Sequence, residues 1–181
     1  TVGDLRRRGF AVAIMDWRGQ GGSARPVGDP RKGHIHSFSE YDRDLRCFMR
    51  DVVLPDCPPP FIALGHSMGS HIALRSMGEP GCWFDSAVLA APMIELTREV
   101  LGFPRGLVEF YARLGVASRF GRSYVRGGSD EPGYTTEFEG NMLSSDLERF
   151  RRNRQIERAA PELLLGSPTI GWLDAAMRSM R

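Results

Sequence analysis

The chain has 181 residues, of which 41% are apolar and 25% charged, and its 24 basic and 22 acidic side chains give a net charge of +2. This composition is that of a globular domain and excludes disordered and fibrous chains. The near-balance of charge gives no reason to expect nucleic acid or an anionic membrane as the main partner. No apolar run reaches the roughly 18–20 residues of a membrane span.

The opening of the chain predicts a helix, a strand and a loop, in that order. Residues Asp4 to Arg8 are typical of the end of a helix that Gly9 closes with a left-handed cap. The run from Phe10 to Met15 is short, apolar and partly β-branched, which predicts a buried strand. Gly, Ser and Pro crowd residues Gly19 to Pro30, so this stretch is predicted to be a loop.

A helical pattern then occupies Ser37 to Val53, with Ser37 or Ser39 as the N-cap. The run Pro58 to Pro60 breaks it. The side chains predicted to face inward are Tyr41, Leu45, Phe48, Met49 and Val52.

Two further apolar runs flank a short helical pattern. Phe61 to Leu64 is predicted to be a buried strand, Ser70 to Met77 a helix, and Phe84 to Ala90 a third strand. Strands that alternate with helices favour an α/β fold with a parallel sheet flanked by helices.

The second half of the chain has a different character. Residues 95–168 contain helical stretches, a Gly-rich break at Arg126 to Gly133 and no convincing buried strand, which suggests a helical cap or lid. Thr169 to Met180 has the pattern of an amphipathic helix. We therefore expect an α/β core over residues 1–94, a cap over 95–168, and a helix returning to the core over 169–181.

The pentapeptide Gly65-His66-Ser67-Met68-Gly69 fits G-x-S-x-G, in which a serine nucleophile sits on a sharp turn from a strand to a helix. Its context agrees, because a predicted strand precedes it and a predicted helix follows it. Small residues at Gly65 and Gly69 would leave room for the reversal. We expect Ser67 to be the nucleophile and the Met68 N–H to be one oxyanion donor. The alternative is that Ser67 merely caps the following helix.

Gly19, Gly21 and Ala24 also satisfy G-x-G-x-x-A, the weak form of a dinucleotide fingerprint. That fingerprint needs a helix to start within it, whereas Pro26 and Pro30 prevent a helix directly after it. A nucleotide-binding protein is therefore the weaker interpretation. We expect a structural turn instead, with internal hydrogen-bonding groups on Asp16, Arg18 and Ser23.

The pattern D-x-R-G-x-G-x-S over Asp16 to Ser23, followed by GHSMG, resembles the lysophospholipase and monoacylglycerol-lipase branch of the α/β-hydrolase fold. That branch also includes the serine aminopeptidase-type hydrolases. Ser37 to Leu45 resembles the helix between the two motifs, and Ala91 to Met93 the end of the next strand. The segments that resemble the cap and its exit in bacterial lysophospholipase L2-like proteins are Asn141 to Asp146, Arg151 to Arg154 and Gly166 to Trp172.

The resemblance implies a Ser–Asp–His triad whose acid and histidine lie on strands after the cap. The histidines of this chain come too early to match; they are His34, His36, His66 and His71. Asp174 is interpreted as a solvated residue of the last helix, not as the triad acid. The triad Asp and His, the first strands of the fold and the second oxyanion donor are expected outside this chain, which should be nearly inactive in isolation.

Five arginines fall on one predicted cap helix, and a solvated helix face is the default interpretation. They are Arg149, Arg151, Arg152, Arg154 and Arg158. Attraction of phospholipid headgroups or an anionic membrane surface is the alternative. Apolar residues at helical spacing fit either core or an acyl site, with core as the default; they are Leu101, Phe103, Leu107, Val108, Phe110 and Tyr111.

Three cysteines, Cys47, Cys57 and Cys82, lack metal-ligand spacing, so we expect free thiols in a reducing compartment. The opening residues lack the apolar segment of a signal peptide, although the chain begins at Thr1 and its native amino terminus is expected to precede it. We therefore expect a cytoplasmic protein, with peripheral contact to the inner membrane through the cap as an alternative.

The residues and the resemblance together predict a hydrolase of carboxylic esters, of lysophospholipase or monoacylglycerol lipase type. Its substrate would be a small lipid or ester, cleaved through an acyl-enzyme at Ser67. A serine peptidase of the same fold and a non-catalytic relative that serves as a binding module are the alternatives. We expect no metal, no cofactor and no nucleic acid.

Overall fold

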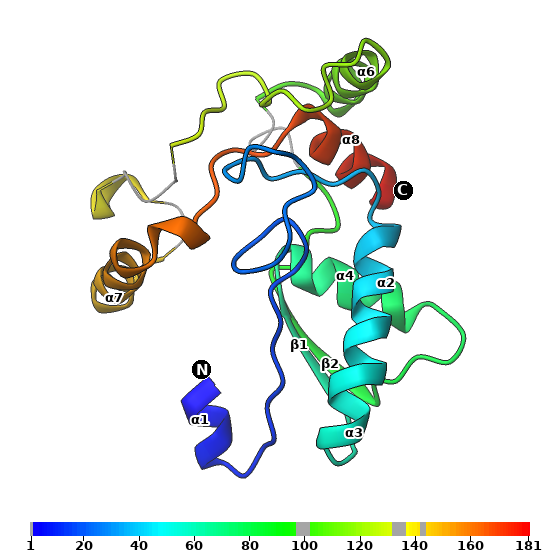
Figure 1. Ribbon diagram of the computed structural model, residues 1–181, viewed down its shortest axis with the longest axis vertical. Coiled ribbons are helices and arrows are strands. Elements are labelled where there is room, and N and C mark those ends of the chain that lie inside the picture. The colour runs from blue at the N-terminus through cyan, green and yellow to red at the C-terminus, as the bar shows by residue number, and fades with distance from the viewer. Residues whose placement is uncertain (1, 97–101, 132–136, 142–143) are drawn as a thin grey trace. The chain divides into compact units, whose positions relative to one another are not determined.

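The computed structural model describes residues 2–96, 102–131, 137–141 and 144–181 (Figure 1). The chain divides into two compact units, and each is described by itself. The first unit comprises Thr1–Met15, Ser37–Val108 and Ala176–Arg181, and the second comprises Asp16–His36 and Glu109–Ala175.

A parallel pair of strands lies at the centre of the first unit. Strand β1 (Ile62–His66) pairs with β2 (Ser86–Ala90), in a register that sets Ile62 opposite Ser86 and His66 opposite Ala90. Helix α4 (Met68–Met77) connects them and packs against both. Helix α2 (Ser39–Phe48) packs against α4 (Figure 1). The predicted order of strand, helix and strand is confirmed, because a parallel pair requires such a crossover.

The sheet is covered less than the apolar runs predict. Ala63 is buried, but the exposed fractions of Leu64 and Val88 are 55% and 58%. Helix α4 packs on this pair. Because alternate residues of a strand point to opposite faces, a helix on one face leaves the side chains of the other face uncovered. The prediction of fully buried strands is therefore wrong for the described part of the chain.

The segment from Phe10 to Met15 is not a strand. It pairs with neither β1 nor β2, and its Phe10 and Ile14 side chains are 48% and 77% exposed. An apolar run becomes a strand only when a neighbouring strand satisfies its backbone groups, and a short run does not reveal that partner. The helix before it, α1 (Val2–Arg7), is present, and Gly9 has φ +89° as expected of its left-handed cap.

The helix predicted over Ser37 to Val53 continues to Asp56 in the structure, and its pitch changes along its length. Helix α2 is followed by a π-helical turn, η1 (Met49–Val53), and then by α3 (Leu54–Asp56). Tyr41, Leu45 and Met49 are buried as predicted, but Val53 is buried in place of Val52, which is 40% exposed. The wider π turn moves the inward position by one residue.

The start of α2 also differs from the expectation. Phe38 occupies the N-cap position and makes no side-chain cap bond. The hydrogen bonds at the start of the helix come from Ser37, one residue earlier. Its N–H donates to Glu40 Oε1 over 3.1 Å, and its Oγ accepts from the Ser39 N–H over 3.3 Å.

The second unit joins the glycine loop to the later part of the chain. The Thr169 N–H donates to the Gly33 carbonyl over 2.9 Å, and the Gly166 N–H donates to the Arg31 carbonyl over 2.8 Å. The His34 Nδ1 lies 2.7 Å from Thr169 Oγ1, with both residues buried. These bonds lie within the second unit, which groups residues 16–36 with 109–175. The interpretation of 95–168 as a cap stays a prediction.

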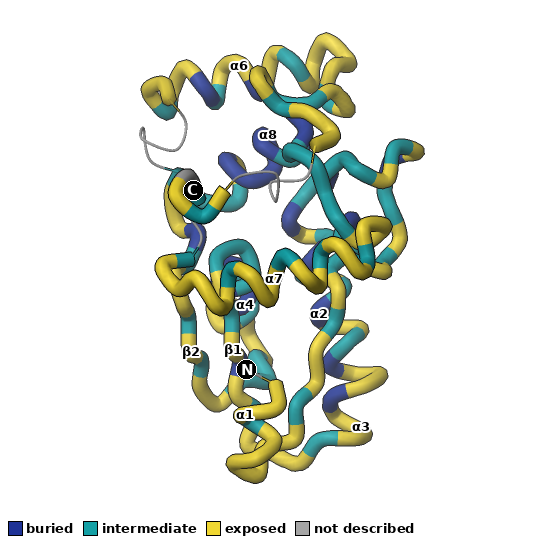
Figure 2. The backbone as a smooth tube through the Cα atoms, turned by 90° about the vertical axis from the view of Figure 1, so that its left-hand side faces the viewer, coloured by how far each residue is buried: buried dark blue, intermediate teal, exposed yellow. Residues whose placement is uncertain are grey.

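The helices of the second half differ strongly in burial. Within the residues that the structure describes, they are α6 (Arg105–Ala117), η3 (Phe138–Gly140), α7 (Leu147–Ala159), η4 (Pro161–Leu163) and α8 (Ile170–Ser179). Figure 2 shows α8 largely in dark blue, whereas α7 has no buried residue. Helix α8 confirms the helix that the amphipathic pattern of 169–180 predicts, and most of its residues are buried. Among the described residues, no helix is both long and apolar enough to cross a membrane.

The glycine loop is a structural turn, as predicted. The Gly22 N–H donates to Asp16 Oδ2 over 2.9 Å, and the Ser23 hydroxyl donates to the Asp16 carbonyl over 2.6 Å. The helix that follows is α2, which begins only at Ser39, so no helix starts within the fingerprint. The geometry that a dinucleotide pyrophosphate requires is therefore not formed.

We expect Gly21→Ala to lower the free energy of unfolding by about 1–3 kcal/mol. Gly21 has φ +50°, and a Cβ there would overlap the Asp16 carboxylate. Gly28→Ala is the matched control, because a Cβ at Gly28 meets nothing within 4 Å. Chemical denaturation of both variants measures the difference, and equal stability of the two would contradict the assigned role of the turn.

Candidate active site

The chain reverses sharply at Ser67, between the last residue of β1 and the first residue of α4. Ser67 has φ +51° and ψ −117°, a backbone conformation that residues with a side chain rarely adopt. Such a conformation costs roughly 1–3 kcal/mol and persists only where the surroundings hold it. The sequence predicts this reversal from the strand before the motif and the helix after it.

Four hydrogen bonds hold the turn from two sides. The Ser67 N–H donates to the Ala90 carbonyl over 3.0 Å, and the Met93 N–H donates to the Ser67 carbonyl over 3.2 Å. The His71 N–H donates to the same Ser67 carbonyl over 3.1 Å, and the buried Ser70 hydroxyl donates to Ala90 over 3.1 Å. Both backbone groups of Ser67 are therefore fixed by the end of β2 and by the first turn of α4.

The two glycines of the motif have different roles. A Cβ at Gly65 would lie 2.7 Å from the backbone of Ser70, so the close approach of β1 to α4 requires glycine there. At Gly69 a Cβ would meet nothing within 4 Å. The prediction that both glycines relieve a clash is thus confirmed for Gly65 and is wrong for Gly69 within the described part of the chain.

Met68 is the first residue of α4 and is half-buried. The N–H groups of a first turn point along the helix axis, where the helix dipole is positive. This geometry suits a donor to a developing oxyanion next to Ser67. His66 is exposed at the end of β1, and neither it nor His71 hydrogen-bonds the Ser67 hydroxyl in the described residues.

The other residues considered as site candidates belong to the second unit. His34 is buried against Thr169, and His36 is exposed with its ring 4.7 Å from that of His34, both in the second unit. Asp174 was predicted to be solvated, but it is only 7% exposed. The prediction is wrong because α8 is buried along most of its length, so its acid does not lie on a polar face.

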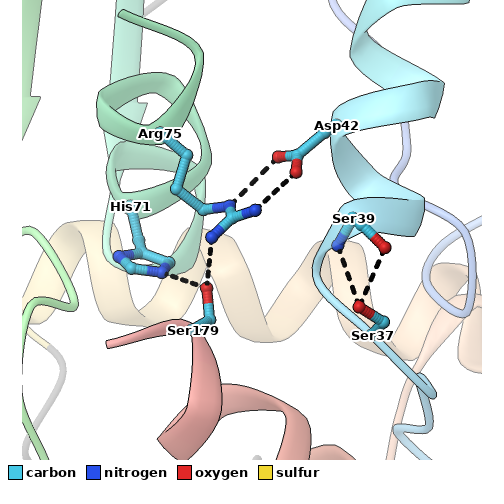
Figure 3. Close-up of polar contacts among 6 residues, drawn as sticks. All are labelled: Ser37, Ser39, Asp42, His71, Arg75 and Ser179. Atoms are coloured by element: carbon cyan, nitrogen blue, oxygen red, sulfur yellow. Dashed lines mark hydrogen bonds and ion pairs between the residues drawn. The ribbon is translucent and has the colours of Figure 1, made fainter. Parts of the chain in front are cut away.

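A polar cluster that the sequence did not predict lies in the first unit (Figure 3). The Arg75 guanidinium makes two bonds to Asp42, of 3.1 and 2.6 Å, and a third of 3.1 Å to Ser179 Oγ. The His71 Nε2 lies 2.7 Å from the same Ser179 oxygen. Asp42 lies on α2, Arg75 and His71 on α4, and Ser179 at the end of α8. No local pattern links residues so far apart in sequence, so no sequence signal pointed to this cluster.

The charges of this cluster follow from its contacts. The hydrogen bonds to Asp42 raise the pKa of Arg75. Burial lowers the pKa of His71, and the positive charge of Arg75 lowers it further, while the negative charge of Asp42 acts in the opposite direction. The imidazole is therefore neutral near neutral pH.

The arginines of α7 divide into two kinds. Four of them are exposed, namely Arg149, Arg151, Arg152 and Arg158. Arg154 instead stacks over the Phe150 ring at 4.8 Å and lies 3.8 Å from Glu157. A solvated face therefore describes most of the helix, but not Arg154.

The apolar residues considered for an acyl site lie mainly on α6. Val108 is buried, whereas four members of the set are exposed: Phe103 (47%), Leu107 (54%), Phe110 (63%) and Tyr111 (37%). Leu101 lies outside the described residues. The default interpretation of the set as core is therefore wrong for these four side chains, and an acyl-binding role stays a prediction. Cys47, Cys57 and Cys82 are free cysteines.

The order of strand, strained serine and helix is the one expected at the nucleophile turn of an α/β-hydrolase, and the family comparison points to the same class. A family model described as "Serine aminopeptidase, S33" matches residues 1–181. The chain therefore belongs to this family, and the resemblance inferred from its motifs is confirmed.

Individual relatives are similar over nearly the whole chain. Lysophospholipase L2 of Escherichia coli strain K12 is 33% identical over 171 residues, which cover 94% of this chain and 49% of the relative. The probable lysophospholipase L2 of Haemophilus influenzae is 25% identical over 178 residues, which cover 98% of this chain and 54% of the relative. The chain thus spans about half the length of the curated relatives it matches. No solved structure matches it.

We expect Gly65→Ala to disrupt the turn, lowering the free energy of unfolding by about 3 kcal/mol, because the added methyl meets backbone that cannot move aside. Gly69→Ala is the matched control and should leave stability unchanged or raise it by up to about 1 kcal/mol. Denaturation of the complete protein, as its gene encodes it, measures both. Comparable losses in the two variants would contradict the assigned geometry.

The lowered pKa of His71 makes stability depend on pH. The unfolded chain protonates this imidazole below the ordinary pKa of about 6.5, whereas the folded protein does so only at lower pH. The unfolded state therefore binds more protons in that interval, and the free energy of unfolding falls as the pH drops.

We expect the wild-type protein to lose more stability than His71→Gln between about pH 7.5 and about pH 5.5. Glutamine removes the titrating group and keeps a polar side chain of similar reach. Denaturant unfolding of both proteins across this range measures the effect, and parallel losses would mean that His71 titrates normally.

Proposed function

We propose that the complete protein is a serine hydrolase that cleaves carboxylic esters through an acyl-enzyme on Ser67. The observation that carries the proposal is the strained backbone of Ser67 at a strand-to-helix turn, with φ +51°. A serine that caps a helix has no need of this conformation, since N-cap residues ordinarily have negative φ in the β region. A functional role explains why the strained Ser67 backbone is kept, because the turn then presents the Ser67 hydroxyl for reaction.

In this mechanism Ser67 Oγ attacks the ester carbonyl carbon while its proton passes to a general base. The carbonyl oxygen becomes an oxyanion beside the Met68 N–H. Collapse of the tetrahedral intermediate breaks the ester C–O bond, and the departing alcohol takes the proton from the base. Water then attacks the acyl-enzyme by the same steps in reverse, which releases the acid and restores Ser67.

The general base has to come from outside the residues of this turn. His66 is exposed without a bond to the Ser67 hydroxyl, and the His71 ring is occupied with Ser179. We infer that the triad histidine and its acid belong to a part of the protein that this chain does not include. The isolated chain should then be nearly inactive, because removal of triad members costs on the order of 10⁴- to 10⁶-fold.

The substrate is proposed to be a lysophospholipid or a monoacylglycerol. Two relatives carry the name lysophospholipase L2 or probable lysophospholipase L2, which favours a single-chain lipid ester. The exposed apolar residues of α6 are suited to an acyl chain. The description of the family as serine aminopeptidase makes a peptidase the second candidate.

We expect a fluorophosphonate probe to label the complete wild-type protein at Ser67, and Ser67→Ala to abolish that labelling. Hydrolysis of a lysophospholipid should fall on the order of 10⁴- to 10⁶-fold in the same variant. Ser76→Ala, in the last turn of the same helix, is the matched control and should behave as wild type. Equal labelling of wild type and Ser67→Ala would remove Ser67 from this role.

A substrate panel separates the two candidates. The proposal expects turnover of lysophosphatidylcholine or monoacylglycerol and none of an amino-acid nitroanilide. Turnover of the nitroanilide alone would replace the esterase with the peptidase.

A further inference from the structure

His71 connects the strained turn to the polar cluster. Its backbone N–H donates to the Ser67 carbonyl over 3.1 Å, which closes the first turn of α4. Its imidazole Nε2 lies 2.7 Å from Ser179 Oγ, and its ring meets Phe38 edge-on with centroids 5.5 Å apart. His71 is only 5% exposed. One residue therefore joins Ser67, through its backbone, to α8 and to Phe38, through its side chain.

The Ser179 hydroxyl is itself held in place. Arg75 can only donate, so its Nη1 donates to Ser179 Oγ over 3.1 Å, and Arg75 is in turn held by Asp42 through two bonds. The Ser179 oxygen thus has a fixed position between a guanidinium and the imidazole (Figure 3). Because Ser179 Oγ is fixed, it restricts the orientation of the His71 ring and, through the ring, the backbone of the first turn of α4.

The contacts of His71 also define what it cannot do. Its Nε2 faces Ser179, and its Nδ1 is buried without a hydrogen-bond partner in the described residues. A general base would have to hydrogen-bond the Ser67 hydroxyl. The charged group beside the ring is Arg75 of α4, which Asp42 of α2 balances, so the neutral imidazole is the form that suits the cluster.

We propose that His71 is a positioning residue, whose bond to Ser179 fixes the first turn of α4 and so keeps the Ser67 hydroxyl and the Met68 N–H aligned for attack. A strained residue relaxes unless several contacts over-determine it, and the His71 amide is one of the three bonds on the Ser67 backbone. A small displacement of a catalytic group costs rate even when substrate still binds. This inference rests on the acyl-enzyme proposed above.

The test compares paired variants of the complete protein. His71→Phe keeps a ring against Phe38 and removes both nitrogens, while His71→Gln keeps a polar group near the Nε2 position. Ser179→Ala removes the shared hydroxyl, and Ser179→Thr keeps it. Val53→Ala, at a buried position of η1 away from the turn, controls for a general loss of stability. The readouts are kcat and KM for a p-nitrophenyl ester, the rate of fluorophosphonate labelling at Ser67, and the melting temperature.

His71→Phe and Ser179→Ala are expected to lower kcat and the labelling rate roughly tenfold with KM unchanged, as the loss of one positioning bond implies. His71→Gln and Ser179→Thr should recover most of the rate. Val53→Ala should lower the melting temperature and leave kcat unchanged. If His71→Phe does not fold, the Ser179 pair decides the question by itself.

Two results would overturn the inference, and they differ in whether the proposed hydrolase survives. Full labelling rates in His71→Phe and Ser179→Ala, with a lower melting temperature only, would make the cluster purely structural while Ser67 keeps its role. Failure of the wild-type protein to label at Ser67 would overturn the proposed hydrolase, and this inference with it.

Discussion

The backbone of Ser67 has a strained conformation that only the elements around it can hold. A positive φ at a serine is unfavourable by itself, so the surrounding structure has to hold it. The Ala90 carbonyl, the Met93 N–H and the His71 N–H together fix both backbone groups of this residue. The turn is therefore a product of the sheet and the helix jointly, and neither alone would maintain it.

The parallel pairing of β1 with β2 places the acceptor for the Ser67 N–H. The register sets His66 opposite Ala90, so β2 ends where Ser67 leaves β1 and its last carbonyl meets the Ser67 N–H. Gly65 allows α4 to turn back against β1, since any side chain there would strike Ser70. The His71–Ser179–Arg75–Asp42 cluster then links α4 to α2 and to the end of α8. The Ser67 backbone is thus held by Ala90, Met93 and His71, and the cluster ties the helix of His71 to two further helices.

Sequence reasoning succeeded where the determinants are local and failed where they are distant. The motif from Gly65 to Gly69, with its flanking strand and helix, predicts the reversal, because glycine spacing and hydrophobic pattern are visible within a few residues. The run from Phe10 to Met15 has the composition of a strand, but strand formation depends on a partner that composition does not identify. Val53 replaces Val52 in the core because a π turn shifts the helix phase. The Ser179 contact joins residues more than a hundred positions apart, which no spacing rule reveals.

A crystal structure of the complete protein after reaction with a fluorophosphonate would test the role of Ser67 directly. We expect phosphorus bonded to Ser67 Oγ, a phosphoryl oxygen within hydrogen-bond distance of the Met68 N–H, and a positive φ retained at Ser67. Phosphorus on a different residue, or Ser67 in an ordinary helical conformation with no tight turn, would contradict it.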